Sequence, residues 1–267
     1  MGSLCVFLVE TPNVMTTTRE NGSLYTKIEQ GVATLEFGHP ASNSMPSELL
    51  DRLAREFDKL SHENEVRVIL LKSEGEKAFC AGASFDELKR IGNIEEGKAF
   101  FSGFAKVINA MRKCTKPVIG RIQGKAVGGG VGLAAACDYC FATDQAAIKL
   151  SELSIGIGPF VIAPAIIRKM GTAALSELSL GAQDWRNAYW AKDRGLYSRV
   201  FGSIKEMDEE VDFFCRKVAS YNPEAVYEMK KIWWEGTANW DELLEERAAV
   251  SGELVLSDHT KKALTRF

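Results

Sequence analysis

Residues 124–132 read Gly-Lys-Ala-Val-Gly-Gly-Gly-Val-Gly, and four of the last five are glycine. Glycine lets the backbone approach another group closely, because it has no Cβ. The next residues, 133–137, read Leu-Ala-Ala-Ala-Cys and favour a short apolar helix. A bare backbone at a helix N-terminus presents unpaired N–H groups that can hold a phosphate or a developing oxyanion. Glu152, twenty residues after Gly132, is then a candidate acid or base.

Composition is that of an ordinary globular protein. The chain has 267 residues, 46% of them hydrophobic, and a formal charge of −3. This balance gives no basic field to attract nucleic acid or anionic lipid, and no apolar run approaches the roughly 20 residues that span a bilayer. We therefore expect neither a nucleic-acid nor a membrane partner. Residues 1–22 are expected to be a disordered leader, or Met15 to be the natural start.

Cysteine and histidine placement argues against a metal site. Cys137 and Cys140 have the spacing of half a zinc site or of a redox pair, but no second such pair completes it. The three histidines are far apart in sequence and lack metal-ligand spacing. We expect no metal and expect buried, reduced thiols, which fits a cytoplasmic protein.

The hydrophobic pattern alternates between strands and helices and then becomes helical. It predicts a hairpin turning at Gly31, helices at 47–60, 95–111, 161–170 and 172–181, and strands at 66–72, 116–123 and 139–143. Ser47 and Ser84 are expected N-caps, and Gly171 is expected to stop a helix. This order predicts an α/β core over residues 23–200, followed by a helical region over 201–267.

The glycine run allows three interpretations. It could serve close helix packing. It could be a dinucleotide-binding fingerprint, because residues 130–135 fit G-x-G-x-x-A, although the acidic partner Asp144 comes too early and Glu152 lies beyond a further strand. It could also act with residues 81–83, a second small-residue loop after a strand. The two loops together would supply two N–H groups to one oxygen, as an oxyanion hole requires.

Four segments together resemble the crotonase (enoyl-CoA hydratase/isomerase) superfamily. Residues 79–85 resemble its F-x-A-G-A-D-I/L loop, residues 124–134 its G-x-x-x-G-G-G-x-x-L-A segment, residues 137–138 its C/S-D pair, and residues 151–156 its P-E-x-x-x-G segment. The match covers residues 23–267 in order and spacing. It implies a crotonase-like spiral of ββα units with a C-terminal helical trimerisation region, in a homotrimer or a dimer of trimers.

The resemblance also implies a site for an acyl-CoA thioester. The N–H groups of Ala83 and Gly129 would polarise the thioester carbonyl as an oxyanion hole. Coenzyme A, as part of the substrate and not a separate cofactor, would run along residues 79–85 and contact Phe79, Ala81, Ser84 and Phe85.

This chain departs from the family at the catalytic positions. Hydratases carry two glutamates, and here the first position is Gly132 while the second is Glu152. A single carboxylate favours Δ3-Δ2 double-bond isomerisation, with a one-glutamate hydratase, a non-catalytic acyl-CoA-binding paralogue and a nicotinamide dehydrogenase as alternatives.

Binding positions depart as well. Ser84 replaces an aspartate, and Ala41 stands where a basic residue is often found. Gly132, Pro159 and Phe160 are expected to line a reshaped acyl pocket.

Overall fold

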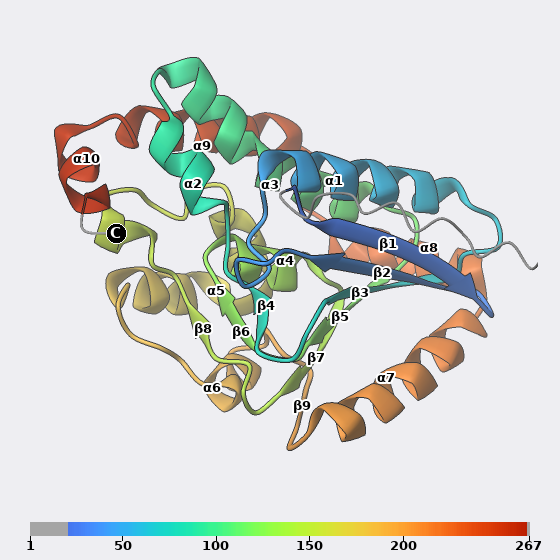
Figure 1. Ribbon diagram of the computed structural model, residues 1–267. Coiled ribbons are helices and arrows are strands. Elements are labelled where there is room, and N and C mark those ends of the chain that lie inside the picture. The colour runs from blue at the N-terminus through green and yellow to red at the C-terminus, as the bar shows by residue number, and fades with distance from the viewer. Residues whose placement is uncertain (1–20, 266–267) are drawn as a thin grey trace, which may run out of the picture.

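The computed structural model describes residues 21–265 and contains two sheets and ten α-helices within that range (Figure 1). The prediction of a leader over residues 1–22 falls almost entirely outside the described residues. The larger sheet has the order β1-β2-β3-β5-β7-β9. Its strands are β1 Ser23–Glu29, β2 Val32–Gly38, β3 Val68–Ser73, β5 Val118–Ile122, β7 Tyr139–Thr143 and β9 Arg199–Phe201.

Three short strands form the second sheet, in the order β4-β6-β8, and both of its pairings are parallel. They are β4 Ala78–Cys80, β6 Lys125–Val127 and β8 Ile148–Lys149. The chain thus leaves the large sheet after β3, β5 and β7, and adds one strand to the small sheet each time. A helical segment follows each such pair, so the predicted spiral of ββα units is confirmed.

Helices follow the small-sheet strands. α2 Phe85–Arg90 and α3 Ile94–Lys113 follow β4, and α4 Gly129–Ala136 follows β6. The 3-10 helix η2 Glu152–Ile155 and α5 Ala163–Leu180 follow β8. Gly171 breaks α5 at φ 82° and ψ 163°, which confirms the expected stop at this residue.

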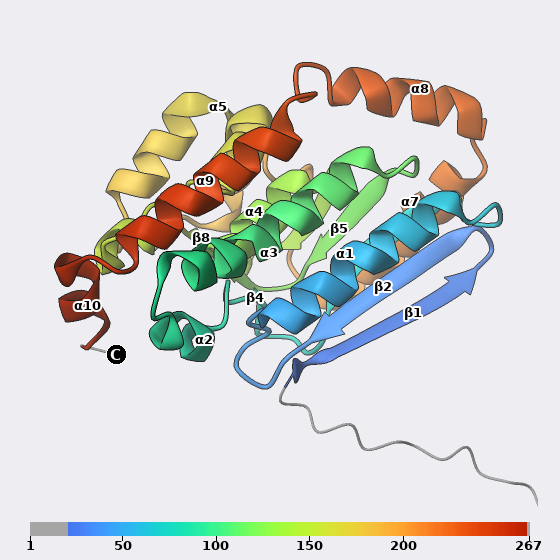
Figure 2. The ribbon, with the colours of Figure 1, turned by 90° about the horizontal axis from the view of Figure 1, so that it is seen from above.

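The remaining helices surround this core. They are α1 Ser47–His62, α6 Ala188–Asp193, α7 Ile204–Ala219, α8 Pro223–Trp233, α9 Trp240–Leu254 and α10 Asp258–Leu264. Figure 2 shows α1, α3 and α9 side by side in one layer. A Cβ on Gly97 of α3 would lie 2.7 Å from Cα of Gly252 in α9, so the two backbones are in contact. α7 packs on the opposite face of the large sheet through Met207, Val211 and Cys215.

Two expectations for helix starts had different outcomes. Ser84 caps α2, because its hydroxyl accepts a hydrogen bond from the Glu87 N–H at 3.3 Å. Ser47 is not a cap: it is the first residue of α1, and its N–H and hydroxyl both donate to the Glu87 carboxylate. A side chain 40 residues away thus supplies the acceptor that Ser47 was expected to provide.

The large sheet also tests the dinucleotide-binding interpretation. Its strands follow one another in chain order without a reversal, whereas open α/β sheets bind dinucleotides at a point where the strand order reverses. The fold therefore does not favour the nicotinamide dehydrogenase alternative. Among the helices described, none is long and apolar enough to cross a membrane.

A buried ion pair ties the C-terminal helices to the large sheet. Lys230 Nζ lies 3.1 Å from Asp138 Oδ2, and both side chains are 3% exposed. Asp138 also accepts hydrogen bonds from Trp234 Nε1 and from the N–H of Val118, each at 2.8 Å. The guanidinium of Arg168 stacks 3.6 Å from the Trp234 ring. One carboxylate therefore joins α8 to the starts of β5 and β7.

We expect Asp138→Ala to lower the free energy of unfolding by about 3–5 kcal/mol, because it leaves the Lys230 charge buried with a backbone carbonyl, that of Lys116, but without a carboxylate. Urea denaturation measures this change. The matched control is Asp51→Ala, which removes an exposed ion pair with Lys106 and is expected to cost less than about 1 kcal/mol. Equal losses in the two variants would contradict a structural role for the buried pair.

Candidate active site

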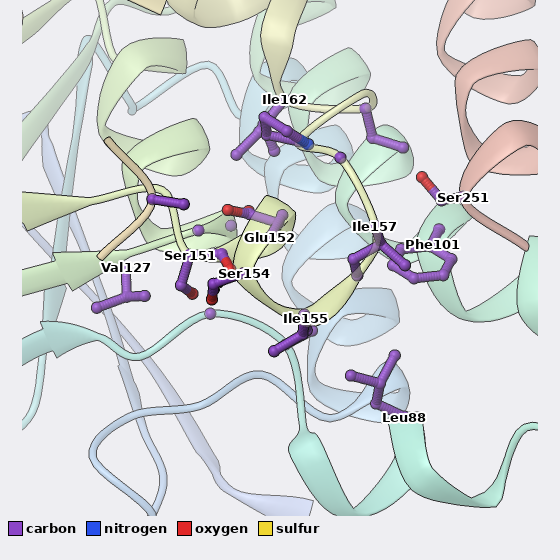
Figure 3. A pocket seen from close by; sticks show the side chains of 18 of the residues that line it. Leu88, Phe101, Val127, Ser151, Glu152, Ser154, Ile155, Ile157, Ile162 and Ser251 are labelled. Carbon is purple, nitrogen blue, oxygen red and sulfur yellow. Dashed lines mark hydrogen bonds between the residues drawn. The ribbon is translucent and has the colours of Figure 1, made fainter. Parts of the chain in front are cut away.

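A cavity of about 590 Å³ opens at the carboxyl ends of β4, β6 and β8 (Figure 3). Its lining includes the loop after β4, the start of α4, all of η2 except Leu153, and side chains of α2 and α3. Val127, Ser151 and Glu152 lie on one side in Figure 3, and Leu88 and Phe101 lie on the other. Glu152 and Lys149 are the only charged residues in this lining within the described chain.

Two glycines let the loops after β4 and β6 approach each other. Gly82 has φ +92°, and a Cβ there would lie 3.0 Å from the carbonyl oxygen of Val127. Gly128 has φ +52° and ψ −118°, a conformation that side chains rarely adopt. The parallel pairing of β4 with β6 places these loops side by side.

The N–H groups of Ala83 and Gly129 have no hydrogen-bond partner among residues 21–265. Ala83 forms a parallel bridge with Met45, in which Met45 bonds to Gly82 O and to the Ser84 N–H. This pattern directs the N–H of Ala83 away from Met45. Gly129 is the first residue of α4, where an N–H has no partner inside the helix. Both residues line the cavity.

Glu152 begins η2, and its carboxylate lies against the backbone of Gly128. A Cβ on Gly128 would lie 2.8 Å from Glu152 Oε1. Oε2 is buried and has no hydrogen-bond partner in the described part of the chain. Burial raises the pKa of the Glu152 carboxyl from 4.5 to about 7, because water no longer solvates the charged form. Near neutral pH, this carboxyl is therefore protonated in some of the molecules and ionised in the others.

An aliphatic side chain fills the space beside Gly132, the position at which the sequence comparison with hydratases leads one to expect a glutamate. Gly132 is buried in α4, and a Cβ added to it would overlap Cγ2 of Ile162. Ile162 itself lines the cavity (Figure 3). Gly132 is not among the lining residues, whereas Ile162, which packs on it, is; a contact of Gly132 with an acyl group stays a prediction.

Other predicted site residues divide into two groups. Ala81, Phe85, Pro159 and Phe160 line the cavity together with Ala83 and Gly129. Phe79 and Ser84 do not. The Phe79 ring is fully buried against Phe37, and the Ser84 hydroxyl caps α2. Contacts of these two residues with coenzyme A stay predictions, and their side chains are already engaged elsewhere.

Sequence reasoning missed part of the lining. Phe100, Phe101 and Phe104 of α3 form an aromatic wall, and the Phe104 ring packs directly over Cα of Gly129. Their signal was present as the apolar face of the predicted helix over 95–111. Lys149 was also missed, because nothing in the sequence indicated that its short strand borders a cavity.

The Cys137–Cys140 pair lies away from the cavity. Both thiols are buried, and each donates to a backbone carbonyl of α4, Cys137 to Leu133 and Cys140 to Ala134. No cluster of potential metal ligands occurs among the described residues. The expectation of buried thiols is confirmed for these two residues.

Known proteins share this sequence pattern and fold. Residues 27–267 match the family described as enoyl-CoA hydratase/isomerase. The chain is 29% identical over 242 residues to the short-chain-enoyl-CoA hydratase of Clostridium acetobutylicum, covering 90% of this chain and 92% of the relative. It is 28% identical over 239 residues to the peroxisomal Delta(3,5)-Delta(2,4)-dienoyl-CoA isomerase of Arabidopsis thaliana, covering 84% of each.

A solved structure, the enoyl-CoA hydratase from Bacillus halodurans, superposes with a TM-score of 0.84 at 20% identity, covering 91% of this chain and 99% of the other. The fold is therefore that of the crotonase superfamily. The chain belongs to the enoyl-CoA hydratase/isomerase family, and it is an enzyme of that family.

The raised pKa of Glu152 predicts a pH-dependent cost to stability. A carboxyl whose pKa rises on folding favours the folded state at low pH, and this contribution is lost as pH rises from 4.5 through about 7. We expect the free energy of unfolding of Glu152→Gln, relative to that of the wild type, to be higher at about pH 8.5 than at about pH 5. The expected increase is on the order of 2 kcal/mol.

Urea denaturation at the two pH values measures the difference. The exposed Glu76→Gln serves as the control and should show no such pH-dependent gain. A Glu152→Gln difference that is the same at both pH values would mean that the carboxyl is not desolvated in the folded protein.

Proposed function

We propose that this protein is an enoyl-CoA isomerase that moves a double bond from the Δ3 to the Δ2 position of an acyl-CoA thioester. The observation that carries the proposal is a single carboxylate whose buried Oε2 has no hydrogen-bond partner in the described chain, placed beside two unpaired backbone N–H groups. Coenzyme A enters as part of the substrate, and no separate cofactor is required by this chemistry.

In this proposal, the thioester carbonyl oxygen accepts hydrogen bonds from the N–H groups of Ala83 and Gly129. These donors stabilise the negative charge that develops on the oxygen and make the C2 protons more acidic. Glu152, ionised, removes a proton from C2, and the electrons move onto the oxygen to give a dienolate. The same carboxyl then returns the proton to C4, which leaves the double bond between C2 and C3.

The pKa of Glu152, about 7, suits both halves of this cycle, because a group that first accepts and then donates a proton works best when its pKa is near the ambient pH. Desolvation is the cause of this value. A bound acyl group would exclude water further and would strengthen the interaction of the two N–H groups with the oxygen.

Hydration is the runner-up, since a relative named as a short-chain-enoyl-CoA hydratase matches the chain as well as one named as a dienoyl-CoA isomerase does. Adding water across a double bond suits two carboxylates around one water molecule. Here Ile162 packs on Gly132 and fills the second position. Within the described lining, Glu152 is the only carboxylate, and this favours isomerisation.

We also retain a homotrimer or a dimer of trimers, and a cytoplasmic location, as parts of the proposal. Large apolar side chains are exposed on the outer helices α7 and α8, including Phe213, Met229, Ile232 and Trp233. Burial of such surface between copies would stabilise an assembly. The reduced thiols are in keeping with a reducing compartment.

We expect Glu152→Gln to lower the turnover of 3-enoyl-CoA by about 10²–10⁴-fold with little change in substrate affinity, because the amide keeps the shape but cannot transfer the proton. Isomerisation and hydration are followed in parallel with 3-enoyl-CoA and 2-enoyl-CoA as substrates. Glu76→Gln is again the control. Unchanged turnover of every active CoA ester would make Glu152 structural, and failure of all esters to react in the wild type would favour a binding protein.

Gly132→Glu is expected to destabilise the protein by about 1–3 kcal/mol without adding hydratase activity, because the new side chain overlaps Ile162. Combining it with Ile162→Ala makes room, and we expect the double variant to raise hydration relative to isomerisation. Ile162→Ala alone is the control for the enlarged cavity. A stable Gly132→Glu single variant that hydrates 2-enoyl-CoA would contradict the packing argument.

A further inference from the structure

The loop that carries the Ala83 N–H is held by the segment just before α1. The N–H of Met45 donates to the carbonyl of Gly82 at 2.8 Å, and the N–H of Ser84 donates to the carbonyl of Met45 at 3.2 Å. These two hydrogen bonds lie on either side of Ala83, whose own N–H takes part in neither. The direction of this N–H therefore depends on where Met45 lies.

A single carboxylate holds the same segment from another element. Glu87 of α2 accepts on Oε2 from the hydroxyl of Ser47 at 2.6 Å and from the N–H of Ser47 at 3.0 Å. Charge-assisted hydrogen bonds are stronger than neutral ones, and a carboxylate at a helix N-terminus also gains from the helix dipole. Pro46 joins Ser47 to Met45 with φ −60°, an angle that its ring fixes. A contact that holds Ser47 therefore also holds Met45.

These contacts form a closed ring of hydrogen bonds around Ala83. Met45 bonds to the residues on either side of Ala83. The Ser84 hydroxyl then accepts from the N–H of Glu87 at 3.3 Å. The Glu87 carboxylate leads back to Ser47, two residues after Met45. Opening the ring at Glu87 would release both the start of α2 and the segment that orients Ala83.

The two side chains that close this ring lie outside the cavity. Ala83, Phe85 and Leu88 line the cavity, whereas Glu87 and Ser47 do not. Glu87 and Ser47 instead border a separate groove on the surface between α1, α2 and α3. An effect of either side chain on a ligand in the cavity must therefore act through the loop over residues 81–84 or through α2.

We propose that Glu87 is a positioning residue that aims the Ala83 N–H at the thioester carbonyl. This rests on the proposed function, in which that N–H and the N–H of Gly129 hold the carbonyl oxygen. A donor stabilises developing charge only when it is preorganised, and removing one such donor typically lowers kcat by about 10²–10³-fold. A displaced donor loses part of this contribution. Ser47 acts in the same direction, because its hydroxyl and N–H hold the carboxylate in place.

The alternative is that Glu87 serves only as a cap for α1. In that case its removal would lower the free energy of unfolding and leave a bound thioester carbonyl unchanged, since α1 contributes no residue to the lining of the cavity in the described chain. The two roles therefore differ in what they predict for hydrogen bonding to the bound carbonyl, which vibrational spectroscopy measures directly.

The spectroscopic test uses a saturated acyl-CoA with an isotopic label at the thioester carbonyl. This ligand has no double bond to move, so it binds without turnover. We expect the infrared band of the carbonyl to shift to lower frequency on binding to the wild type, and to shift less in Glu87→Ala and in Ser47→Ala. Asp86→Ala removes the neighbouring exposed carboxylate of α2 and is the matched control, which should keep the full shift.

Ser47→Ala keeps the backbone hydrogen bond to Glu87, so it supplies the result if Glu87→Ala does not fold. A full shift in Ser47→Ala, or in folded Glu87→Ala, overturns the proposal.

Turnover of 3-enoyl-CoA gives a second measurement. We expect Glu87→Ala to lower kcat by at least about tenfold with KM changed less than about threefold, and Ser47→Ala to lower kcat by a smaller factor. Ser47→Ala should have no further effect in the Glu87→Ala background, because its hydroxyl acts through that carboxylate. Independent effects of the two substitutions, or an unchanged kcat in both variants, overturn the proposal.

The two measurements separate the positioning role from the proposed reaction. A band shift that weakens in both variants, in a protein that turns over no 3-enoyl-CoA, leaves the role of Glu87 standing and removes the isomerase proposal. Isomerisation by a wild type that produces no band shift removes the role of Glu87, because Ala83 would then not polarise the carbonyl.

Discussion

The contact between the Glu152 carboxylate and the Gly128 backbone constrains the whole site. A Cβ at residue 128 would lie only 2.8 Å from Oε1, so a side chain there would displace the carboxylate. Gly128 must also hold φ +52°, and its N–H donates to the carbonyl of Lys149 at 2.9 Å. Gly128 therefore determines where α4 starts and also holds the end of β8 by a hydrogen bond. No side chain of the described residues donates a hydrogen bond to the buried Oε2, because the backbone of Gly128 lies on this side of the carboxylate.

This contact exists because three very short strands end together. The parallel strands β4, β6 and β8 place residues 83, 129 and 152 two or three positions after their carboxyl ends. The large sheet contributes none of these groups. It supplies the buried core that sets the spacing between successive ββα units, and the Asp138–Lys230 pair anchors the outer helix α8 to that core. The large sheet thus stabilises the fold, and the small sheet positions the residues of the candidate site.

The sequence allowed part of this arrangement to be predicted. The two glycine loops, Glu152 and the cap at Ser84 each have a local signal, and the structure brings both loops and Glu152 to one cavity. The small sheet had no such signal, because two or three residues are too few to show an alternating pattern. Contacts between residues far apart in the sequence could not be predicted from it either. Glu87 replaces Ser47 as the acceptor at the start of α1, and Ile162 closes the position left by Gly132.

The backbone contact between Gly97 and Gly252 has a consequence for how the protein is made. This contact packs α9 closely against α3. Ser251 of α9 and Ala263 of α10 then form part of the cavity wall. Thr260 of α10 is fully buried and donates to the carbonyl of Gly156, just after η2. During synthesis the proton-transfer group therefore leaves the ribosome long before its enclosure does. A nascent chain without these last helices would lack this part of the cavity wall, so the cavity that holds Glu152 would be complete only when the final turns dock.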